Sequence, residues 1–274
     1  MRLSVVISTK NEEKNIKECL ESVKWADEIV VVDDMSTDKT VEICKEYTSK
    51  IFIRDSQGDF HRNKNFGTEQ TSGEWILSLD ADEIITSELA EEIQKAIQDK
   101  EILGYYLKRK NFFIGKWIKG CGWYPDYIIR LFRRGITRWP LLTEDFHGTP
   151  EIREKEKIGY LKNVFLHYSY TSFNQYLEKF NLYSSALAKQ EFNRGVKINF
   201  LIHFLFKPAF IFFRKYILMA GYKDGFRGFF ISIASALTIF MTYAKLWEKQ
   251  TNKVSERHRV PPTLKLQRAG KESE

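Results

Sequence analysis

The sequence predicts an α/β fold in which helices flank a mostly parallel sheet and a helical appendage follows it. In the first hundred residues, short β-branched apolar runs alternate with helical patterns, which is typical of parallel strands joined by crossovers. Charge also divides the 274-residue chain: residues 1–100 carry 13 Lys and Arg against 22 Asp and Glu, whereas the remainder carries 30 against 14. We therefore expect one domain over residues 1–195, a basic apolar helical region over 196–250 and a polar tail over 251–274.

Four strands are expected in the first part of the chain. The run from Leu3 to Thr9 is apolar and rich in β-branched residues, which suits a strand buried on both faces. Similar runs follow at residues 28–34, 50–55 and 74–80, with helical spacing between them and a helix near 61–72. Ligands of such sheets bind outside the carboxyl ends of the strands, so the residues that end each strand are the first candidates for a site.

Beyond residue 100 the pattern is less regular, with one strand expected at residues 127–132 and an exposed helix at 172–193. Two apolar segments follow, 200–222 and 226–247. They could form a buried helical pair, a transmembrane hairpin or helices that lie in the bilayer interface. We favour the interface, because aromatic side chains flanked by Lys and Arg suit it and the basic rear of the chain would attract anionic lipid.

The cysteines and the first residues indicate the cytoplasm. Cys19, Cys44 and Cys121 are odd in number and lack the spacing of a disulfide framework or a metal knuckle, so we expect reduced thiols. The first apolar run is too short for a signal peptide. A nucleic-acid-binding protein, suggested by the net charge of +7, is disfavoured because the basic residues cluster beside apolar segments and no nucleic-acid motif occurs.

The fourth predicted strand ends in the acidic stretch LDADE. Because residues i and i+2 of a strand point to the same side, Asp80 and Asp82 are expected to project together. Two close carboxylates repel each other unless a positive group lies between them. Mg²⁺ or Mn²⁺ binds few protein carboxylates and completes its shell with water and phosphate oxygens. We therefore expect these acids to lack protein cations and to hold a metal-diphosphate.

The other strand ends offer groups that a nucleotide would need. Asp34 is placed to accept a hydrogen bond from a base or a ribose, although it could instead cap the helix that follows. Lys64 and Asn65 could orient a diphosphate or lie on a solvated helix face. The end of the first strand supplies hydroxyls, an amide and a cation: Ser8, Thr9, Lys10 and Asn11.

Four stretches together resemble a known family: SVVISTKNEEKNI, IVVVDDMSTDKT, RNKNFGTEQTSGEWILSLDADE and RLFRR. Over residues 1–190 they are similar to the inverting glycosyltransferases of family 2 with a GT-A fold, and most similar to the bacterial branch that builds lipopolysaccharide core and related cell-envelope glycans. The resemblance implies a nucleotide-sugar donor, usually a UDP-sugar, a divalent metal held by the Asp-x-Asp motif and single displacement at the anomeric carbon. It places the nucleotide at Ser8, Thr9, Lys10, Asn11, Glu12 and Asp34, and the metal and diphosphate at Asp80 and Asp82.

An inverting transfer also needs a general base that takes the proton of the acceptor hydroxyl. Related enzymes often carry Thr-Glu-Asp with the Asp as base, which here implies Asp145 first and Glu144 second. The envelope branch usually shows His-Glu at this point, whereas this chain has His147–Gly148. The acid pair could instead pin a loop to Arg130 or Arg133.

Aromatic residues suggest where an acceptor would bind. Trp117, Trp123 and Tyr124 could stack on sugar rings, although aromatic residues more often belong to a core. His167 is expected to be a structural histidine with satisfied hydrogen bonds.

The expected activity is the transfer of a sugar from a UDP-sugar to a glycan or glycolipid acceptor such as lipopolysaccharide core, at the inner face of the cytoplasmic membrane. Polyprenyl phosphate is the alternative acceptor. A non-enzymatic sugar-binding or nucleic-acid-binding protein is the alternative of another class.

Overall fold

A computed structural model describes residues 1–141, 150–152 and 157–259, with side chains up to residue 252. The chain forms two compact units, Met1–Thr171 and Ser172–Glu274. The sequence analysis places a boundary after residue 195 instead. The difference is the helix Phe173–Asn193, which belongs to the second unit because it packs against the long helix at the end of the chain.

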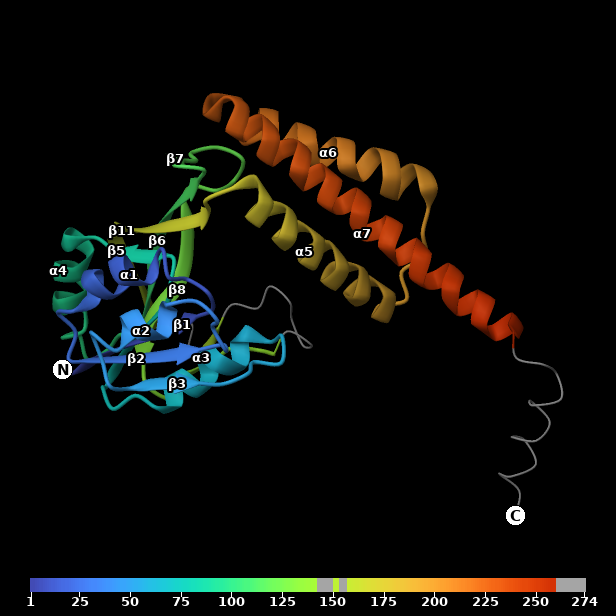
Figure 1. Cartoon of the computed structure of the whole chain (residues 1–274). Coiled ribbons are helices and arrows are strands. Elements are labelled where there is room, and N and C mark those ends of the chain that lie inside the picture. Colours follow the sequence, from blue (N-terminus) through green and yellow to red (C-terminus); the bar gives the residue numbers. More distant parts are fainter. Residues whose placement is uncertain (142–149, 153–156, 260–274) are drawn as a thin grey trace, which may run out of the picture. The chain divides into compact units, whose positions relative to one another are not determined.

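The first unit is built around one mixed sheet with the strand order β3-β2-β1-β4-β8-β6-β11-β5 (Figure 1). Its strands are β1 (Leu3–Thr9), β2 (Glu28–Asp33), β3 (Ile51–Ile53), β4 (Trp75–Asp80), β5 (Glu83–Ile85), β6 (Gly104–Phe113), β8 (Asp126–Arg133) and β11 (Ile158–Tyr170). The short β7 (Lys116–Trp117) pairs with β6, and β9 (Thr137–Arg138) pairs with β10 (Glu151–Ile152). The four strands expected from the sequence are parallel neighbours, which confirms the α/β fold class.

The other half of the sheet has strands of mixed direction. β8 is antiparallel to both β4 and β6, β11 is parallel to β6, and β5 is antiparallel to β11. The strand predicted at residues 127–132 is β8. β6 and β11 are absent from the sequence-based prediction, because buried and part-exposed residues alternate along them only irregularly.

Helices α1 (Ile16–Val23), α2 (Thr40–Cys44), α3 (Phe60–Glu69) and α4 (Ser87–Ala96) flank the sheet. The buried residues of α1 and α4 share a core with Val5 and Ile7 of β1, whereas Val6, on the opposite side of the strand, packs with Phe132. α3 covers that second side so closely that a Cβ added to Gly67 would lie 2.5 Å from Val6 Cγ1. β1 is therefore buried on both faces, as predicted. The three cysteines are free and buried.

The carboxyl ends of β1, β2 and β4 meet at one edge of the sheet. Ser8 of β1 is in register with Asp80 of β4, and Thr9 is in register with Asp33 of β2. Polar residues from three strands, far apart in the sequence, are therefore neighbours at this edge.

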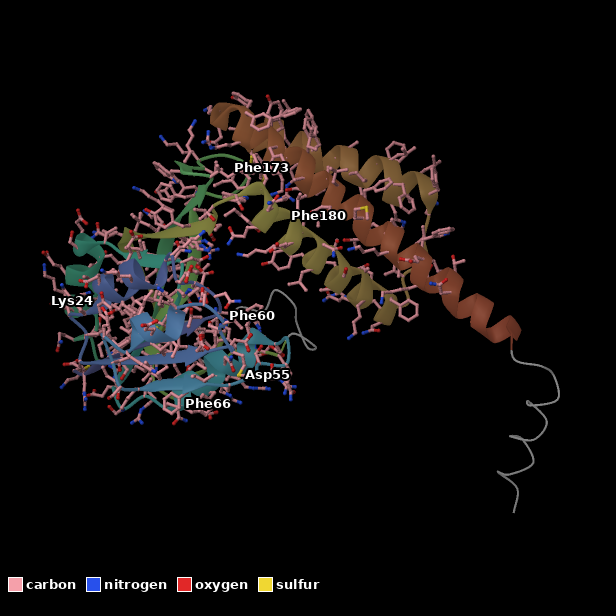
Figure 2. The ribbon with its side chains drawn as sticks, viewed as in Figure 1. Lys24, Asp55, Phe60, Phe66, Phe173 and Phe180 are labelled. Carbon is pink, nitrogen blue, oxygen red and sulfur yellow. The ribbon has the colours of Figure 1, made fainter. Side chains whose placement is uncertain are left out.

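The second unit is helical and contains α5 (Phe173–Asn193), the π-helical η2 (Leu201–Phe206), α6 (Lys207–Phe213), the π-helical η3 (Arg214–Leu218), the 3-10 turn η4 (Gly221–Asp224) and α7 (Phe226–Arg259). α7 packs against α5, where the rings of Phe173 and Phe230 lie 4.8 Å apart; Figure 2 labels Phe173 on α5. α7 also packs against α6, where Lys207 Nζ donates to the Tyr243 hydroxyl at 2.7 Å. The helix predicted at residues 172–193 is α5, but it is less exposed than expected: Ser184 and Ala188 are buried and most other residues are half-buried, because α5 packs against α7.

Candidate active site

The loop after β1 is fastened to the loop after β2. The Asn11 backbone N–H donates to Ser36 Oγ at 2.8 Å, and the Asn11 side-chain oxygen accepts from the Thr37 N–H at 2.8 Å. The Glu12 N–H donates to Thr40 Oγ1 at 2.8 Å. Two of the residues predicted to bind a nucleotide are thus held by their backbones at the end of the neighbouring strand.

Buried hydroxyls at the end of β1 have unused hydrogen-bonding capacity. Among the described residues, Ser8 Oγ and Thr9 Oγ1 have no hydrogen-bond partner, and the same is true of Asp33 Oδ1 on the next strand. A buried polar atom without a partner costs free energy, so such atoms call for a bound group or water. This edge of the sheet is therefore suited to a polar ligand.

Asp34 lies between three donors just beyond β2. Its carboxylate accepts from the Ser56 N–H at 2.7 Å, from the Ser56 hydroxyl at 3.0 Å and from Lys10 Nζ at 2.9 Å. Burial of Asp34 opposes ionisation, but the hydrogen bonds from Ser56 and Lys10 outweigh it and lower the pKa of the carboxyl. The capping alternative is wrong, because Asp38 and not Asp34 accepts from the Thr40 N–H at the start of α2, at 3.0 Å. An ionised Asp34 can accept a hydrogen bond from an N–H or hydroxyl group of a bound ligand.

Asp80 is held by two buried cations. Lys64 Nζ lies 2.6 Å from Asp80 Oδ1, and Arg130 Nη2 lies 2.6 Å from Asp80 Oδ2. The expectation that both acids lack protein cations is therefore wrong for Asp80. Lys64 does not lie on a solvated helix face either, since only 6% of its side chain is exposed. Burial opposes ionisation of Asp80, yet Arg130 and Lys64 hold its pKa well below the ordinary range.

Arg130 is the residue of this cluster that the sequence analysis did not assign to the site. Its Nη2 also lies 2.7 Å from Glu83 Oε1, and Glu83 in turn accepts from the Asp80 N–H at 3.0 Å. Burial opposes the charge of the guanidinium, but Asp80 and Glu83 outweigh it and raise the pKa of Arg130. One guanidinium therefore joins the end of β4 to the start of β5.

Asp82 lies beside a histidine. β4 ends at Asp80, so Asp82 falls in a turn and the alternation of a strand does not extend to it. Its Oδ2 lies 3.5 Å from His167 Nε2, and its carbonyl accepts from the Tyr168 N–H at 3.0 Å. The His167 Nδ1 is bonded to Asn111 at 2.6 Å, so the predicted satisfied histidine is confirmed, but it faces a predicted metal ligand as well.

The segment that leads to the predicted base is anchored on α3. Asn65 exchanges two hydrogen bonds of 2.9 Å with the backbone of Trp139, and His61 Nδ1 lies 2.5 Å from the carbonyl oxygen of Pro140. The chain thus reaches residue 141 beside the helix that carries Lys64. The predicted catalytic residues Asp145 and Glu144 lie outside the described residues.

The aromatic residues proposed for an acceptor form a partly exposed group. The rings of Trp117 and Tyr124 lie 5.1 Å apart, and the ammonium groups of Lys110 and Lys119 each lie 4.7 Å from the centre of the Trp117 ring. Trp123 contacts Tyr170 at the end of β11, with ring centres 6.3 Å apart. These rings are open enough to contact a ligand.

Residues 4–158 match the model of glycosyl transferase family 2, which covers more than half of the chain. The chain belongs to this family. This family 2 glycosyltransferase is 32% identical over 263 residues to an uncharacterized glycosyltransferase of Rickettsia typhi, with 90% of this chain and 87% of that protein covered. It is 28% identical to the lipopolysaccharide core biosynthesis glycosyltransferase LpsC of Rhizobium meliloti, with 92% and 94% covered. Staphylococcus aureus TarS in complex with UDP-GlcNAc has 18% identity and a TM-score of 0.46, with 70% and 67% covered.

Family membership confirms that the chain is an enzyme, a glycosyltransferase, and rejects the non-enzymatic alternative. In the glycosyltransferase, further polar residues lie next to the ion-pair cluster of Asp80, Glu83 and Arg130. No local sequence pattern predicts that they belong there. Arg109 pairs with Asp126 at 2.8 Å, and Asn111 donates to the same carboxylate at 2.9 Å. These residues come together only because β6 pairs with β8, a long-range contact that periodicity does not reveal.

Proposed function

We propose that this glycosyltransferase moves a sugar from a UDP-sugar to a cell-envelope glycan or glycolipid such as lipopolysaccharide core, with inversion, on the cytoplasmic face of the membrane. One observation carries the proposal: three polar groups converge at the ends of three neighbouring strands. They are the Lys10–Asp34 pair, the Ser8 and Thr9 hydroxyls, which have no partner in the described part of the chain, and the Lys64–Asp80–Arg130 cluster. The acceptor class follows the LpsC relative, which covers nearly the whole chain.

The nucleotide would occupy the ends of β1 and β2. Asp34 is ionised and partly exposed, so it can accept from a base N–H or a ribose hydroxyl. Lys10 has a side chain that is 58% exposed and can turn from Asp34 toward a phosphate. Ser8, Thr9 and the fixed backbone of residues 11–12 would complete the contacts.

The donor set fits a divalent metal that relies on its substrate for ligands. Among the described residues no group of three or more His, Cys, Asp or Glu side chains is arranged around a metal position. Mg²⁺ and Mn²⁺ need only one or two protein carboxylates when phosphate oxygens and water supply the rest. Asp82 and Asp80 would hold the ion. When bound, it would neutralise charge that develops on the leaving UDP.

The buried cations have a separate task in this proposal. Lys64 and Arg130 keep Asp80 ionised and fixed, and they place two positive charges beside the site of the diphosphate. Asp145, or Glu144 in its place, would take the proton of the acceptor hydroxyl while the anomeric carbon is attacked from the face opposite the diphosphate. Trp117 and Tyr124 are suited to stack on the acceptor.

The test is to compare the wild-type enzyme with Asp82→Asn and with Asp99→Asn, an exposed loop aspartate that serves as the matched control. Nucleotide-sugars are screened for manganese-dependent hydrolysis, and UDP binding is measured by calorimetry with manganese present or chelated. We expect Asp82→Asn to abolish turnover and to remove the effect of manganese on UDP binding, with circular dichroism unchanged. Full turnover in Asp82→Asn would reject the metal role.

The acceptor is identified separately by mass spectrometry of the products. A product in which the transferred sugar is attached to a lipid phosphate, and not to a core oligosaccharide, would favour polyprenyl phosphate as the acceptor.

A further inference from the structure

The helical segment that precedes α7 exposes an unusual amount of apolar surface. Eleven large apolar side chains between residues 200 and 226 are each at least 45% exposed: Phe200, Leu201, Ile202, Leu205, Phe206, Phe210, Phe213, Ile217, Leu218, Tyr222 and Phe226. Soluble proteins rarely expose a contiguous apolar patch larger than a few hundred Å², and larger ones mark surfaces of interaction. We call these eleven residues the apolar face.

Nine of the eleven residues belong to one helical stretch, residues 200–218, whereas Tyr222 lies in η4 and Phe226 begins α7. Ile202, Phe206, Phe210, Phe213 and Ile217 follow one another at intervals of four, four, three and four residues, which aligns them along the helix. The exposure of these five residues therefore reflects one continuous strip along the helix, and the other exposed apolar residues lie around it.

The opposite side of the same stretch is already covered by α7. His203 and Tyr243 have ring centres 4.2 Å apart, and the ring of Phe212 meets that of Phe229 edge-on at 6.1 Å. Figure 1 shows α6 and α7 running side by side. Packing against α7 thus buries one side of the segment, while the apolar face stays exposed.

Charge beside the apolar face identifies what would cover it. Residues 196–227 contain six basic residues, Lys197, Lys207, Arg214, Lys215, Lys223 and Arg227, against one acid, Asp224. Aromatic and aliphatic side chains interleaved with Lys and Arg match an anionic bilayer surface, where the apolar groups enter the acyl boundary and the cations meet phosphate head groups. A protein partner would have to be both apolar and acidic over the same area.

The contacts of α7 argue for a helix pair lying on the bilayer and not crossing it. Among the described helices, α7 over Phe226–Asn252 is the one long and apolar enough to span a membrane. It is bound along one side to α5, where Lys245 Nζ donates to Asn181 Oδ1 at 2.7 Å and to Ser184 Oγ at 2.8 Å. A helix whose lysine is hydrogen-bonded to polar groups of a neighbouring helix cannot cross the hydrocarbon layer without burying those polar groups in lipid.

We propose that the apolar face seats the protein on a membrane containing anionic phospholipid, parallel to the surface, with Arg214 and Lys223 at head-group depth. The proposal extends the proposed function by assigning the membrane-contacting surface, and it rests on the second unit alone. It therefore stands or falls independently of the donor and metal sites.

The experiment is co-sedimentation of the full chain with vesicles of phosphatidylcholine alone or mixed equally with phosphatidylglycerol. Three variants are compared with the wild type: Phe206→Ser/Phe210→Ser/Phe213→Ser in the apolar face, Arg214→Gln/Lys223→Gln beside it, and Leu177→Ser/Leu182→Ser on α5. The last is the matched control, because both leucines are exposed, at 56% and 61%, but lie outside the face.

We expect the wild type to bind the anionic vesicles and the triple serine variant to bind at least tenfold more weakly. Each removed charge should weaken binding about fivefold at low salt and have little effect at high salt. The α5 control should bind as the wild type does. Far-ultraviolet circular dichroism should be unchanged in all variants, which shows that the helical second unit is folded.

Several results would overturn the proposal. Equal binding of the triple variant and the wild type would exclude the apolar face as the contact surface. Resistance of the wild type to alkaline carbonate extraction would show that the chain spans the bilayer. A dimer in solution that the triple variant abolishes, without vesicle binding by the wild type, would assign the face to a second copy of the chain.

Discussion

Replacing Arg130 by Met removes the guanidinium that joins Asp80 to Glu83 and leaves a side chain of similar length. The wild-type cluster contains Lys64, Arg130 and Arg109 against Asp80 and Glu83. In the variant, Asp80 keeps Lys64 at 2.6 Å, but Glu83, whose side chain is fully buried, keeps only the more distant Arg109 at 3.6 Å among its described cations.

Removing one partner of a buried ion pair costs roughly 3–5 kcal/mol, because a buried charge is left without compensation. Asp80 is 33% exposed and retains Lys64, so we expect the lower end of that range, about 3 kcal/mol. Arg133→Met is the matched control on the same strand. Its guanidinium donates to backbone carbonyls and lies 4.9 Å from the centre of the Trp75 ring, so its loss should cost about 1–2 kcal/mol.

The assay is urea unfolding followed by tryptophan fluorescence, because five of the six tryptophans belong to Met1–Thr171. The pKa of Asp80 is lowered in the folded state, so its stabilising contribution exists at neutral pH and is lost as pH falls below about 4. The difference in free energy of unfolding between the wild type and Arg130→Met should therefore become smaller at acidic pH. A loss no greater than that of Arg133→Met, or a loss independent of pH, would refute the role given to this ion pair.

Two further substitutions test the fold beneath the site. The pKa of Glu28 is lowered to about 2, because hydrogen bonds from Lys50 and two serines outweigh the opposing effect of burial. Since Lys50 is half exposed, Glu28→Gln should lower the free energy of unfolding by roughly 2 kcal/mol at pH 7. The difference in stability between the variant and the wild type should disappear between about pH 4.5 and pH 2. A difference that stays constant with pH in urea unfolding would contradict this. Gly67→Ala would place a Cβ 2.5 Å from Val6 Cγ1 and 2.9 Å from Val32 Cγ2, so thermal unfolding should show a loss of about 1–3 kcal/mol, and an unchanged melting temperature would show that α3 can shift freely.

Local patterns in the sequence were sufficient to predict the parallel half of the sheet. Buried apolar runs mark β1, β2 and β4, and the rule that ligands bind at the carboxyl ends of parallel strands predicted that Asp34 and Asp80 lie at the same edge. This information is local because these three strands are buried on both faces and are therefore predominantly apolar.

The electrostatics of the site could not be predicted in the same way. Arg130 reaches Asp80 because β8 inserts antiparallel beside β4, and His167 reaches Asp82 because β11 ends next to the turn after β4. Both contacts join residues at least 50 positions apart, and neither is encoded in the spacing of neighbouring residues. Lys64 shows the same limit. A lysine on a short helix is expected to be solvated, and its burial follows only from tertiary contacts that the local sequence does not reveal.

The position of β8 also matters while the chain is being made. Trp75, Ile76 and Leu77 of β4 form an apolar row whose partner strand begins only at residue 126. A nascent chain or proteolytic fragment that stops earlier presents this row as an open template to which other copies can add. When β8 pairs with β4, it covers that edge and at the same time places Arg130 beside Asp80. Molecules that avoid self-association are therefore those in which the Lys64–Asp80–Arg130 cluster has already formed.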